Sequence, residues 1–416
     1  MHLRTPNMFS RRAFLSNATG AMVSATGETL WASPRPKIAV ILTVYQPASH
    51  ADVWVTALLE GYDNGQPRTP SVEIVSMYTD QRPQNDMSRA MSAKHGFKIA
   101  STIPEALTLG GGKLAVDGVL LMAEQGKYPV NEKGQILYPR YRFYRQVMEV
   151  YRQSQKTVPL FCDKHLSYDW EKAKWMYDQA RELRFPLMAG SCIPFTWRQP
   201  PLELELGTPI QKAVVAAYGP KEPYGFHALE ALQCMVERRA GGEKGIAAVQ
   251  CLEGPKVWQW TERNDWSQRL LNAALQRVEN RKPGTPQANT AKPILFLVDY
   301  LDGLQSALYL LNGYIQDWTF AAQIQGRPEI ASTKFWSRMK KPWSHATGLT
   351  YQIERLYLTR RPAYPIERTL LTTGALAALM DSSYKRSHRL ETPHLNISYH
   401  APKQSLFNTG RIPPPQ

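Results

Sequence analysis

The chain has 416 residues, of which 43% are hydrophobic and 20% are charged, and its formal net charge is +15 at pH 7. This composition excludes a disordered chain, and the length leaves room for two domains with ordinary cores. No apolar run reaches the roughly 20 residues that a membrane helix needs, so we expect no membrane span. The basic residues are scattered among acids and accompany no recognisable nucleic-acid-binding motif, so we expect no nucleic-acid partner.

Residues 1–36 carry a sequence of the kind that directs a protein to an export system. The run SRRAFL at residues 10–15 resembles the twin-arginine signal, which a receptor reads on proteins that are exported already folded. The apolar stretch that follows is weak, because it contains Glu28 and lacks a clear cleavage site. We therefore expect export to the periplasm or cell envelope. The alternative is a cytoplasmic protein whose basic N-terminus contains two adjacent arginines by chance.

Residues 37–190 alternate short apolar runs with amphipathic helical segments, which is the pattern of parallel βα units. Strands are expected where the apolar runs are continuous, at residues 38–42, 72–77, 116–122, 158–162 and 186–189. Helices are expected after the first strand and at residues 104–107, 138–153 and 169–183. Ser49 is placed to cap the first of these helices. The region is therefore predicted to be a Rossmann-like domain with a parallel sheet.

Residues 191–390 contain longer extended segments. Strands are expected at 212–218, 246–252, 294–300, 305–311 and 314–324, with helices at 226–237 and 366–380 and a linker at 281–292. Asp302-Gly303 and Asn312-Gly313 are turn signals, which predict that the last three strands form an antiparallel meander. We expect a second α/β domain with an open, largely antiparallel sheet, and an extended tail at 391–416. The turn signals argue against a TIM barrel, the main alternative fold.

The four cysteines indicate packing rather than a metal site. Cys162, Cys192, Cys234 and Cys251 stand far apart in the sequence and show no CxxC spacing. We interpret them as small buried hydrophobic residues, and neither a zinc site nor a disulfide framework is expected.

Several short segments, in this order, resemble a known enzyme family. They are the first βα unit ending in Ser49-His50-Ala51, FCDKHL at 161–166, GFHALE at 225–230, YQIE at 351–354 and RTLL at 368–371. From about Lys37 to Tyr399 the chain resembles the Gfo/Idh/MocA family of nicotinamide-dependent sugar and polyol oxidoreductases. The resemblance implies NAD or NADP as cofactor, a sugar or polyol as substrate and a homo-oligomer. It also places residues 351–354 in a last strand and 368–371 in a last helix.

The dinucleotide site departs from the family pattern. A G-x-G-x-x-G turn lets the backbone approach the pyrophosphate, but Leu42, Val44 and Pro47 stand at the three glycine positions. Their side chains occupy space that the pyrophosphate normally fills, and Pro47 also removes a backbone donor. We therefore expect a cofactor to bind weakly or in a shifted pose. The residues expected to contact it are Thr43, Ser49, Asp80 after the second strand and Glu124 after the third.

The positions that carry the family's chemistry are better preserved. Lys164 lies where the family has the lysine of its E-K-P motif, which orients a substrate hydroxyl and assists its proton transfer. His227 and Glu230 match the end of the D-x-x-x-H-x-x-D pattern, whose histidine takes the substrate proton. Pro223 replaces the first Asp of that pattern, and Glu222 is adjacent. Lys164, His227 and Glu230 are the predicted catalytic residues, and neither Lys164 nor His227 is expected to fill a core.

The same region of the sequence allows two other functions. His227, Glu230, His165, Asp163 and Glu124 are residue types that bind divalent metals, and a metal-dependent sugar lyase, epimerase or isomerase needs no dinucleotide. The other alternative is a non-catalytic carbohydrate-binding protein on the same fold. The prediction of a nicotinamide-dependent oxidoreductase includes no metal site.

Overall fold

The computed structural model describes residues 34–412. Its first sheet has six parallel strands in the order β5–β4–β1–β6–β7–β8. The strands are β1 (Lys37–Leu42), β4 (Glu73–Thr79), β5 (Lys98–Ala100), β6 (Gly118–Met122), β7 (Leu160–Asp163) and β8 (Leu187–Gly190). The strand order reverses beside β1, as in a Rossmann fold, and ligands of such sheets bind at the carboxyl ends of the strands there. The prediction of a Rossmann-like parallel sheet is confirmed.

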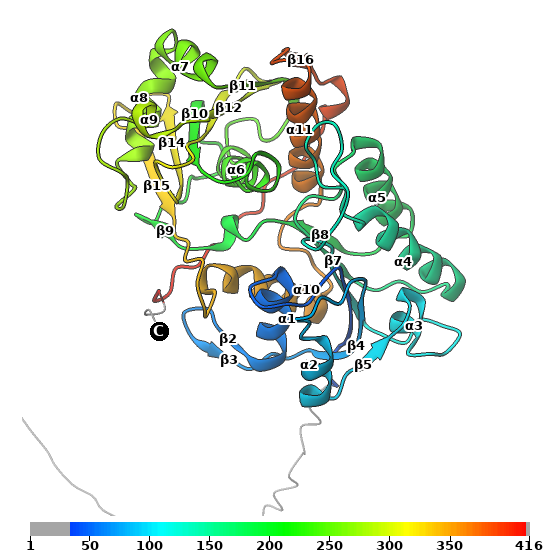
Figure 1. Cartoon of the computed structure of the whole chain (residues 1–416). Helices are drawn as coiled ribbons and strands as arrows, with labels where there is room; N and C mark the ends of the chain where they lie inside the picture. The colour runs from blue at the N-terminus through cyan, green and yellow to red at the C-terminus, as the bar shows by residue number, and fades with distance from the viewer. Residues whose placement is uncertain (1–33, 413–416) are drawn as a thin grey trace, which may run out of the picture. The chain divides into compact units, whose positions relative to one another are not determined.

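Helices cover both faces of this sheet (Figure 1). They are α1 (His50–Glu60), α2 (Ser88–His95), α3 (Ile103–Thr108), α4 (Arg140–Ser154) and α5 (Trp170–Glu182). Because side chains alternate along a strand, Val40 packs with α1 on one face while Ile41 packs with α3 and α4 on the other. Ser49 caps α1 as predicted, since its Oγ accepts a hydrogen bond from the Asp52 amide at 3.2 Å.

The second sheet is open and largely antiparallel, as predicted. Its order is β16–β11–β12–β13–β10–β14–β15–β9, and only the β10–β13 pair is parallel. The strands are β9 (Arg198–Gln199), β10 (Ile210–Ala217), β11 (Ile246–Glu253), β12 (Ile294–Tyr300), β13 (Gln305–Leu310), β14 (Trp318–Ile324), β15 (Ala331–Phe335) and β16 (Leu390–Glu391). This sheet brings the helix after β10, which carries the predicted histidine, to the edge of the first sheet.

The predicted meander of three strands is wrong in its last pairing. β12 and β13 form the expected hairpin, but β10 lies between β13 and β14. The turn residue Asn312 explains the difference, because its side chain bonds the backbone N and O of Gly219 at 2.5 and 3.0 Å. It therefore ties the end of β13 to the end of β10 instead of closing a second hairpin.

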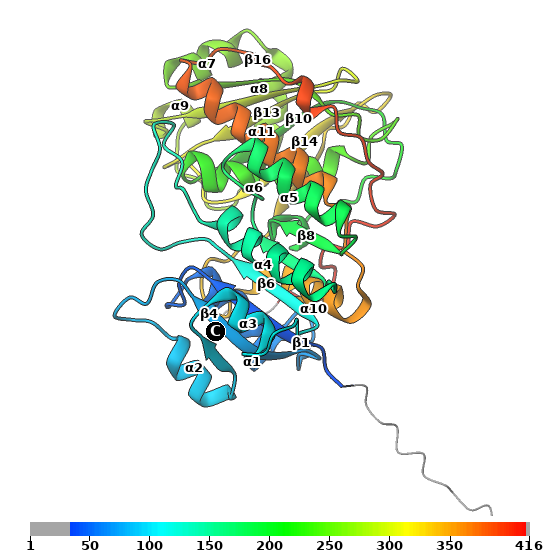
Figure 2. The same ribbon diagram turned by 90° about the vertical axis from the view of Figure 1, so that its right-hand side faces the viewer.

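Helices cover the second sheet on both faces. α6 (Lys221–Val236) and α11 (Glu367–Tyr384) pack on one face, and α7 (Pro255–Glu262) and α8 (Asp265–Leu275), which the sequence analysis did not predict, pack on the other. A short helix, α9 (Pro286–Asn289), follows. α5 and α11 contact each other and lie side by side in Figure 2. This contact joins the two sheets through their helices.

Residues 351–354 are helical, so their assignment to a last strand is wrong. They lie in α10 (Thr347–Thr359), whose buried Leu349, Ile353 and Leu356 recur at helical spacing and pack with the α1 side of the first sheet. The Glu354 carboxylate accepts hydrogen bonds from the Tyr62 hydroxyl and the Ser71 amide, both at 2.5 Å. Periodicity within the segment itself indicates a helix, and the family resemblance misplaced it.

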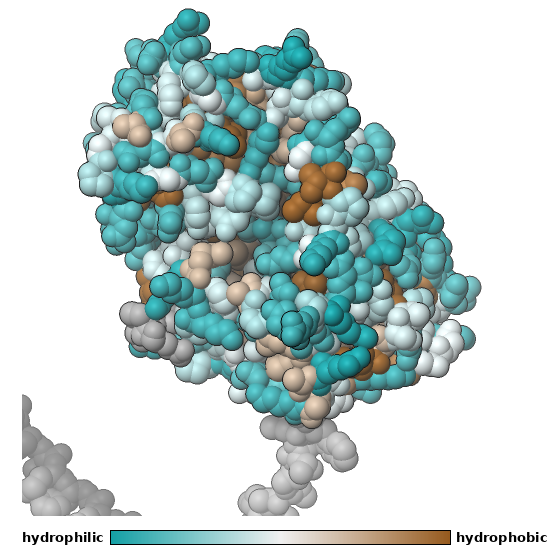
Figure 3. Space-filling view, viewed as in Figure 1, coloured by the Kyte–Doolittle hydropathy of each residue, from teal (hydrophilic) through white to brown (hydrophobic). Residues whose placement is uncertain are grey.

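The described residues bear on two other expectations. All four cysteines are free and buried, as interpreted from their spacing. Between residues 34 and 412 no helix is long and apolar enough to cross a membrane. Hydrophilic residues cover most of the face in Figure 3, and hydrophobic ones form small separate patches. Residues 1–33, which hold Arg11 and Arg12 of the predicted leader, lie outside the described residues.

Candidate active site

Lys164 directly follows β7 and has an unusual backbone conformation. Its φ is 64°, in the left-handed region, and its amide donates to the Gly190 carbonyl at 3.2 Å. The side chain is only 3% exposed, which contradicts the expectation that it lies outside the core. Its Nζ lies 3.6 Å from Glu124 Oε1 and donates to the Pro223 carbonyl at 3.4 Å. A strained backbone that holds a buried ammonium group is a feature of functional sites.

Glu124 holds Lys164 from the end of β6. It is buried and also forms an ion pair with Arg140, the first residue of α4. Burial by itself raises the pKa of Glu124, but Lys164 and Arg140 outweigh it and lower that pKa below its ordinary value. Glu124 is therefore a carboxylate that fixes two cations, which differs from the cofactor contact that the sequence predicts.

A second, partly buried pair connects the start of α1 with the end of β7. His50 Nδ1 lies 2.5 Å from Asp163 Oδ2, and the Asp163 side chain is 2% exposed. Burial raises the pKa of Asp163, but His50, Lys164 and Arg140 together lower it below its ordinary value. Asp163 thus adds negative charge beside Lys164.

His227 is held by a serine that the sequence analysis did not single out. Ser191 follows β8, and its Oγ lies 2.5 Å from His227 Nδ1 while it accepts from the Ile193 amide at 3.0 Å. His227 is buried, and burial followed by the positive charge of Lys164 keeps its pKa well below its ordinary value. The imidazole is therefore neutral. The position of Ser191, directly after a predicted strand at the same edge as Lys164, is the signal in the sequence that marks it.

Tyr224 lies between the two predicted catalytic side chains. Its ring centroid is 6.0 Å from Lys164 Nζ and 5.9 Å from the ring of His227. Lys164 directly follows β7 of the first sheet and His227 lies on α6, which packs on the second sheet, so the two side chains approach one another at the carboxyl edge of the first sheet. The conformation of Lys164 and the contact with Ser191 fix both side chains.

Glu230 contacts Ser191 and α11 rather than Lys164. It is fully buried, its Oε1 accepts from the Thr372 hydroxyl at 2.7 Å, and its Oε2 accepts from the Ser191 amide at 3.5 Å. Burial raises the pKa of Glu230 to about 7. The structure thus places Glu230 as a support for Ser191 and, through it, for His227.

Replacing Glu230 with Gln is expected to flatten the pH dependence of stability. The pKa of Glu230 is about 7 in the folded protein and 4.5 when unperturbed, so the folded state binds more protons between these values. The contribution of Glu230 to the free energy of unfolding is fully present below pH 4.5. This contribution falls by about 3 kcal/mol as the pH rises to about 7. Urea denaturation between about pH 5 and pH 8 measures the difference. Identical slopes for the two proteins would contradict the assignment.

His165 and Glu222 form a second part of the buried cluster. His165 Nε2 lies 3.9 Å from Glu222 Oε1 and 3.4 Å from Arg140 Nη1, and burial keeps the pKa of His165 well below its ordinary value. Burial raises the pKa of Glu222 to about 7, although its oxygens accept from the Gln135 side chain at 3.1 Å and the Ile136 amide at 3.2 Å. Glu222 is therefore bound to Gln135 rather than placed beside His227.

The amides at the start of α1 are already bound by the protein's own side chains. The His50 amide donates to Gln125 Oε1 at 2.8 Å, and the Ala48 amide donates to Asp52 Oδ2 at 2.9 Å. Thr43 is fully buried and donates to the Glu124 carbonyl at 2.6 Å. Asp52, which is 2% exposed, puts a carboxylate where a Rossmann fold receives a phosphate.

Asp80 is also engaged within the chain. Its carboxylate accepts hydrogen bonds from the Tyr78 and Tyr128 hydroxyls, each at 2.8 Å, and from Arg142. Gln81 forms two reciprocal side-chain bonds with the backbone of Lys127, each at 2.9 Å. Residues 125–128 therefore lie across the carboxyl ends of β1 and β4. A dinucleotide therefore fits this crevice only if residues 125–128 move.

The five residues considered as metal ligands are distributed among separate contacts. Asp163 pairs with His50, Glu124 with Arg140 and Lys164, and His227 with Ser191. No group of three or more His, Cys, Asp or Glu side chains with metal-binding geometry occurs in residues 34–412.

Comparison with known proteins shows the fold. No family model matches the sequence, and no curated protein matches it. Among solved structures, GenD2 from gentamicin A biosynthesis, in complex with NAD, has a TM-score of 0.53 and 13% identity, covering 91% of this chain and 99% of that one. Myo-inositol 2-dehydrogenase from Lactobacillus plantarum has a TM-score of 0.53 and 9% identity, covering 86% and 99%. Myo-inositol dehydrogenase from Lactobacillus casei, in complex with NAD(H) and myo-inositol, has a TM-score of 0.51 and 10% identity, covering 86% and 96%.

Proposed function

We propose that the protein is an NAD(P)-dependent oxidoreductase that acts on a sugar or polyol. The observation that carries this proposal is the approach of Lys164 and His227 across Tyr224 at the carboxyl edge of the parallel sheet. The similar solved structures include two dehydrogenases named for myo-inositol, and NAD or NAD(H) is present in one of these and in GenD2. Lys164, His227 and the fold together favour a reaction at a substrate hydroxyl.

Each residue has a defined task in this proposal. In this role the neutral His227 carries its proton on Nδ1 and donates it to Ser191 Oγ, which leaves Nε2 unprotonated to accept the proton of a substrate hydroxyl. Lys164, held by Glu124, orients that hydroxyl and stabilises negative charge on its oxygen. The described residues form no open site for the nicotinamide cofactor, because residues 125–128 occupy the crevice at the carboxyl ends of β1 and β4. Binding of the cofactor therefore requires that this segment move.

An activity panel tests the proposal. Purified protein is incubated with NAD+ or NADP+ and a set of sugars and polyols, and formation of the reduced nicotinamide is followed by absorbance. Turnover with at least one polyhydroxy compound is the expected result. If no compound reacts with either cofactor, the oxidoreductase proposal fails. The filled crevice would then favour the second candidate, a carbohydrate-binding protein without a dinucleotide.

We also propose that residues 1–36 direct export by the twin-arginine route. Support comes from the sequence of the leader, with Arg11 and Arg12 at its centre. Changing both arginines to Lys is expected to retain the protein in the cytoplasm, because the receptor reads the arginine pair itself. Fractionation of cells that express the full chain measures this. The same distribution for wild type and variant would reject the export proposal.

A further inference from the structure

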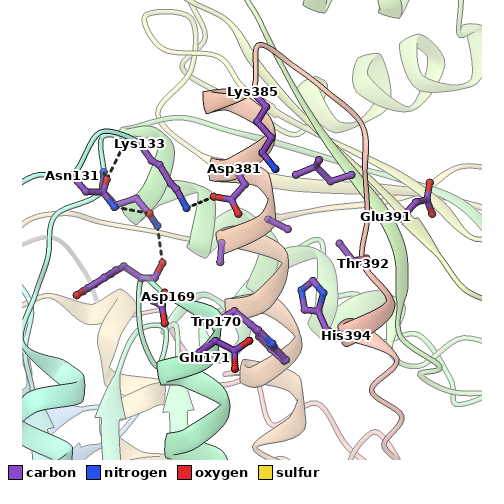
Figure 4. A pocket seen from close by; sticks show the side chains of 15 residues that line it. Asn131, Lys133, Asp169, Trp170, Glu171, Asp381, Lys385, Glu391, Thr392 and His394 are labelled. Atoms are coloured by element: carbon purple, nitrogen blue, oxygen red, sulfur yellow. Dashed lines mark hydrogen bonds and ion pairs between the residues drawn. The ribbon is translucent and has the colours of Figure 1, made fainter.

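A separate cavity of about 480 Å³ lies away from Lys164 and His227. Figure 4 shows its walls, which come from the start of α5, the end of α11, the loop around residues 131–135 and the segment around 390–394. Its volume is in the range of sites for small molecules. Gln135 belongs to this wall, and its side chain bonds both the Tyr168 carbonyl and Glu222. The cavity is thus separated from the buried cluster by Gln135.

Two aromatic side chains form one side of the cavity. The rings of Trp170 and His394 lie 4.9 Å apart and are tilted by 55°. A side chain at Gly374 would meet the Trp170 ring at 2.8 Å, so the glycine lets α11 press closely against the indole and fix its position. Burial lowers the pKa of His394, so its ring is neutral at pH 7. A fixed, neutral aromatic surface suits the C–H face of a sugar ring.

The rest of the wall offers both hydrogen-bond donors and acceptors. Lys133 and Asp381 form an ion pair across the cavity, and Figure 4 shows Lys385, which directly follows α11, near them. Hydroxyl groups both donate and accept, so they match a wall that carries ammonium and carboxylate groups together. The lining has two lysines and four carboxylates, the latter being Asp169, Glu171, Asp381 and Glu391. Glu391 pairs with Arg389 outside the cavity, so three carboxylates face the two lysines. This negative balance disfavours an acidic ligand.

We propose that this cavity binds a sugar or polyol that carries no acidic group, as a site distinct from the proposed active site. The fixed aromatic side supplies apolar contact, and the mixed polar wall bonds the hydroxyls. The proposal does not depend on dinucleotide binding, because none of the cavity's residues belongs to the crevice at β1 and β4.

Calorimetric titration of the full chain without any dinucleotide tests the proposal. The probes are myo-inositol, glucose and maltose, with glucuronate as the acidic comparison. Saturable binding of at least one neutral probe, about tenfold tighter than that of glucuronate, is expected. Binding should weaken by at least about tenfold in Trp170→Ala and in Asp381→Asn. A thermal melt of each variant checks that it folds. If Trp170→Ala does not fold, the affinity of Asp381→Asn for the neutral probe still tests the proposal.

Two matched variants serve as controls. Trp175 lies on the same helix, α5, but its ring packs against Tyr141, and Asp178 pairs with Lys174 outside the cavity. Trp175→Ala and Asp178→Asn are expected to bind the probe as the wild type does. Absence of saturable binding of every neutral probe, or binding that Trp170→Ala and Asp381→Asn leave unchanged, would overturn the proposal. Neither outcome bears on the oxidoreductase assay.

Discussion

Replacing Arg368 with Ala is expected to lower the free energy of unfolding by about 3–5 kcal/mol, because it leaves a buried carboxylate without its cation. Arg368 on α11 donates from Nε to Glu237 Oε2 at 2.8 Å, and its Nη2 pairs with Oε1 of the same residue. The two side chains are 3% and 1% exposed. Glu237 directly follows α6, so the pair holds the helix that carries His227 against α11. Urea denaturation at neutral pH measures the loss.

Arg389 provides the control for this prediction. It also pairs with two carboxylates, Asp299 and Glu391, but its side chain is 46% exposed. Arg389→Ala is expected to change the free energy of unfolding by no more than about 1 kcal/mol, because water screens exposed ion pairs. A loss in Arg368→Ala as small as that in Arg389→Ala would show that the buried pair does not hold α6 in place.

Replacing Lys164 with Met is expected to lower kcat by about 100- to 10,000-fold, the usual range for loss of a group that assists proton transfer. Met has a similar length and no charge, so it fits the buried position. Glu124 keeps Arg140 as its second cation, and the variant is therefore expected to fold. The measurement is the steady-state oxidation of whichever substrate the activity panel identifies.

Lys174→Met is the matched control for Lys164→Met. Lys174 lies on α5 and pairs with Asp178, with 43% of its side chain exposed. Its replacement is expected to leave kcat unchanged. If Lys164→Met also keeps kcat within about twofold of the wild type, Lys164 has a structural role and the proposed mechanism is wrong.

Local signals were sufficient to predict much of the fold. The continuous apolar runs at 38–42 and 158–162 coincide with central strands, because a strand covered on both faces excludes polar residues. The cap at Ser49 was also predictable, because a helix cap depends only on residues that are neighbours in the sequence. The position of β10 between β13 and β14 was not predictable in this way. It depends on the contact between Asn312 and Gly219, which are distant in the sequence.

In the candidate site too, contacts between residues that are distant in the sequence were not predictable. Placing Lys164 at a strand end required only the local pattern. The His50–Asp163 pair, by contrast, joins residues 113 positions apart, and the Tyr128–Asp80 bond joins residues 48 apart. The sequence contains Asp80 and Gln125 but does not indicate that they already have partners. Only the folded chain shows that residues 125–128 lie in the crevice.

Two contacts of the segment 125–128 can be removed with little strain elsewhere. Gln125 has φ of 69°, a conformation that glycine adopts readily. Its side-chain oxygen accepts a hydrogen bond from the His50 amide. The Tyr128 hydroxyl donates a hydrogen bond to Asp80 Oδ2. The double variant Gln125→Gly/Tyr128→Phe therefore frees one amide at the start of α1 and leaves Asp80 Oδ2 with only the exposed Arg142 as partner, while Gln81 still holds Lys127.

Calorimetric titration of NADH and NADPH into the wild type and this double variant tests the central claim most directly. The claim is that a dinucleotide binds the crevice only when the segment 125–128 moves. We expect weak binding to the wild type and about tenfold tighter binding to the variant, because each lost hydrogen bond contributes about 0.5–1.5 kcal/mol. Equal affinity for the two proteins, or no detectable binding to either, would contradict the claim.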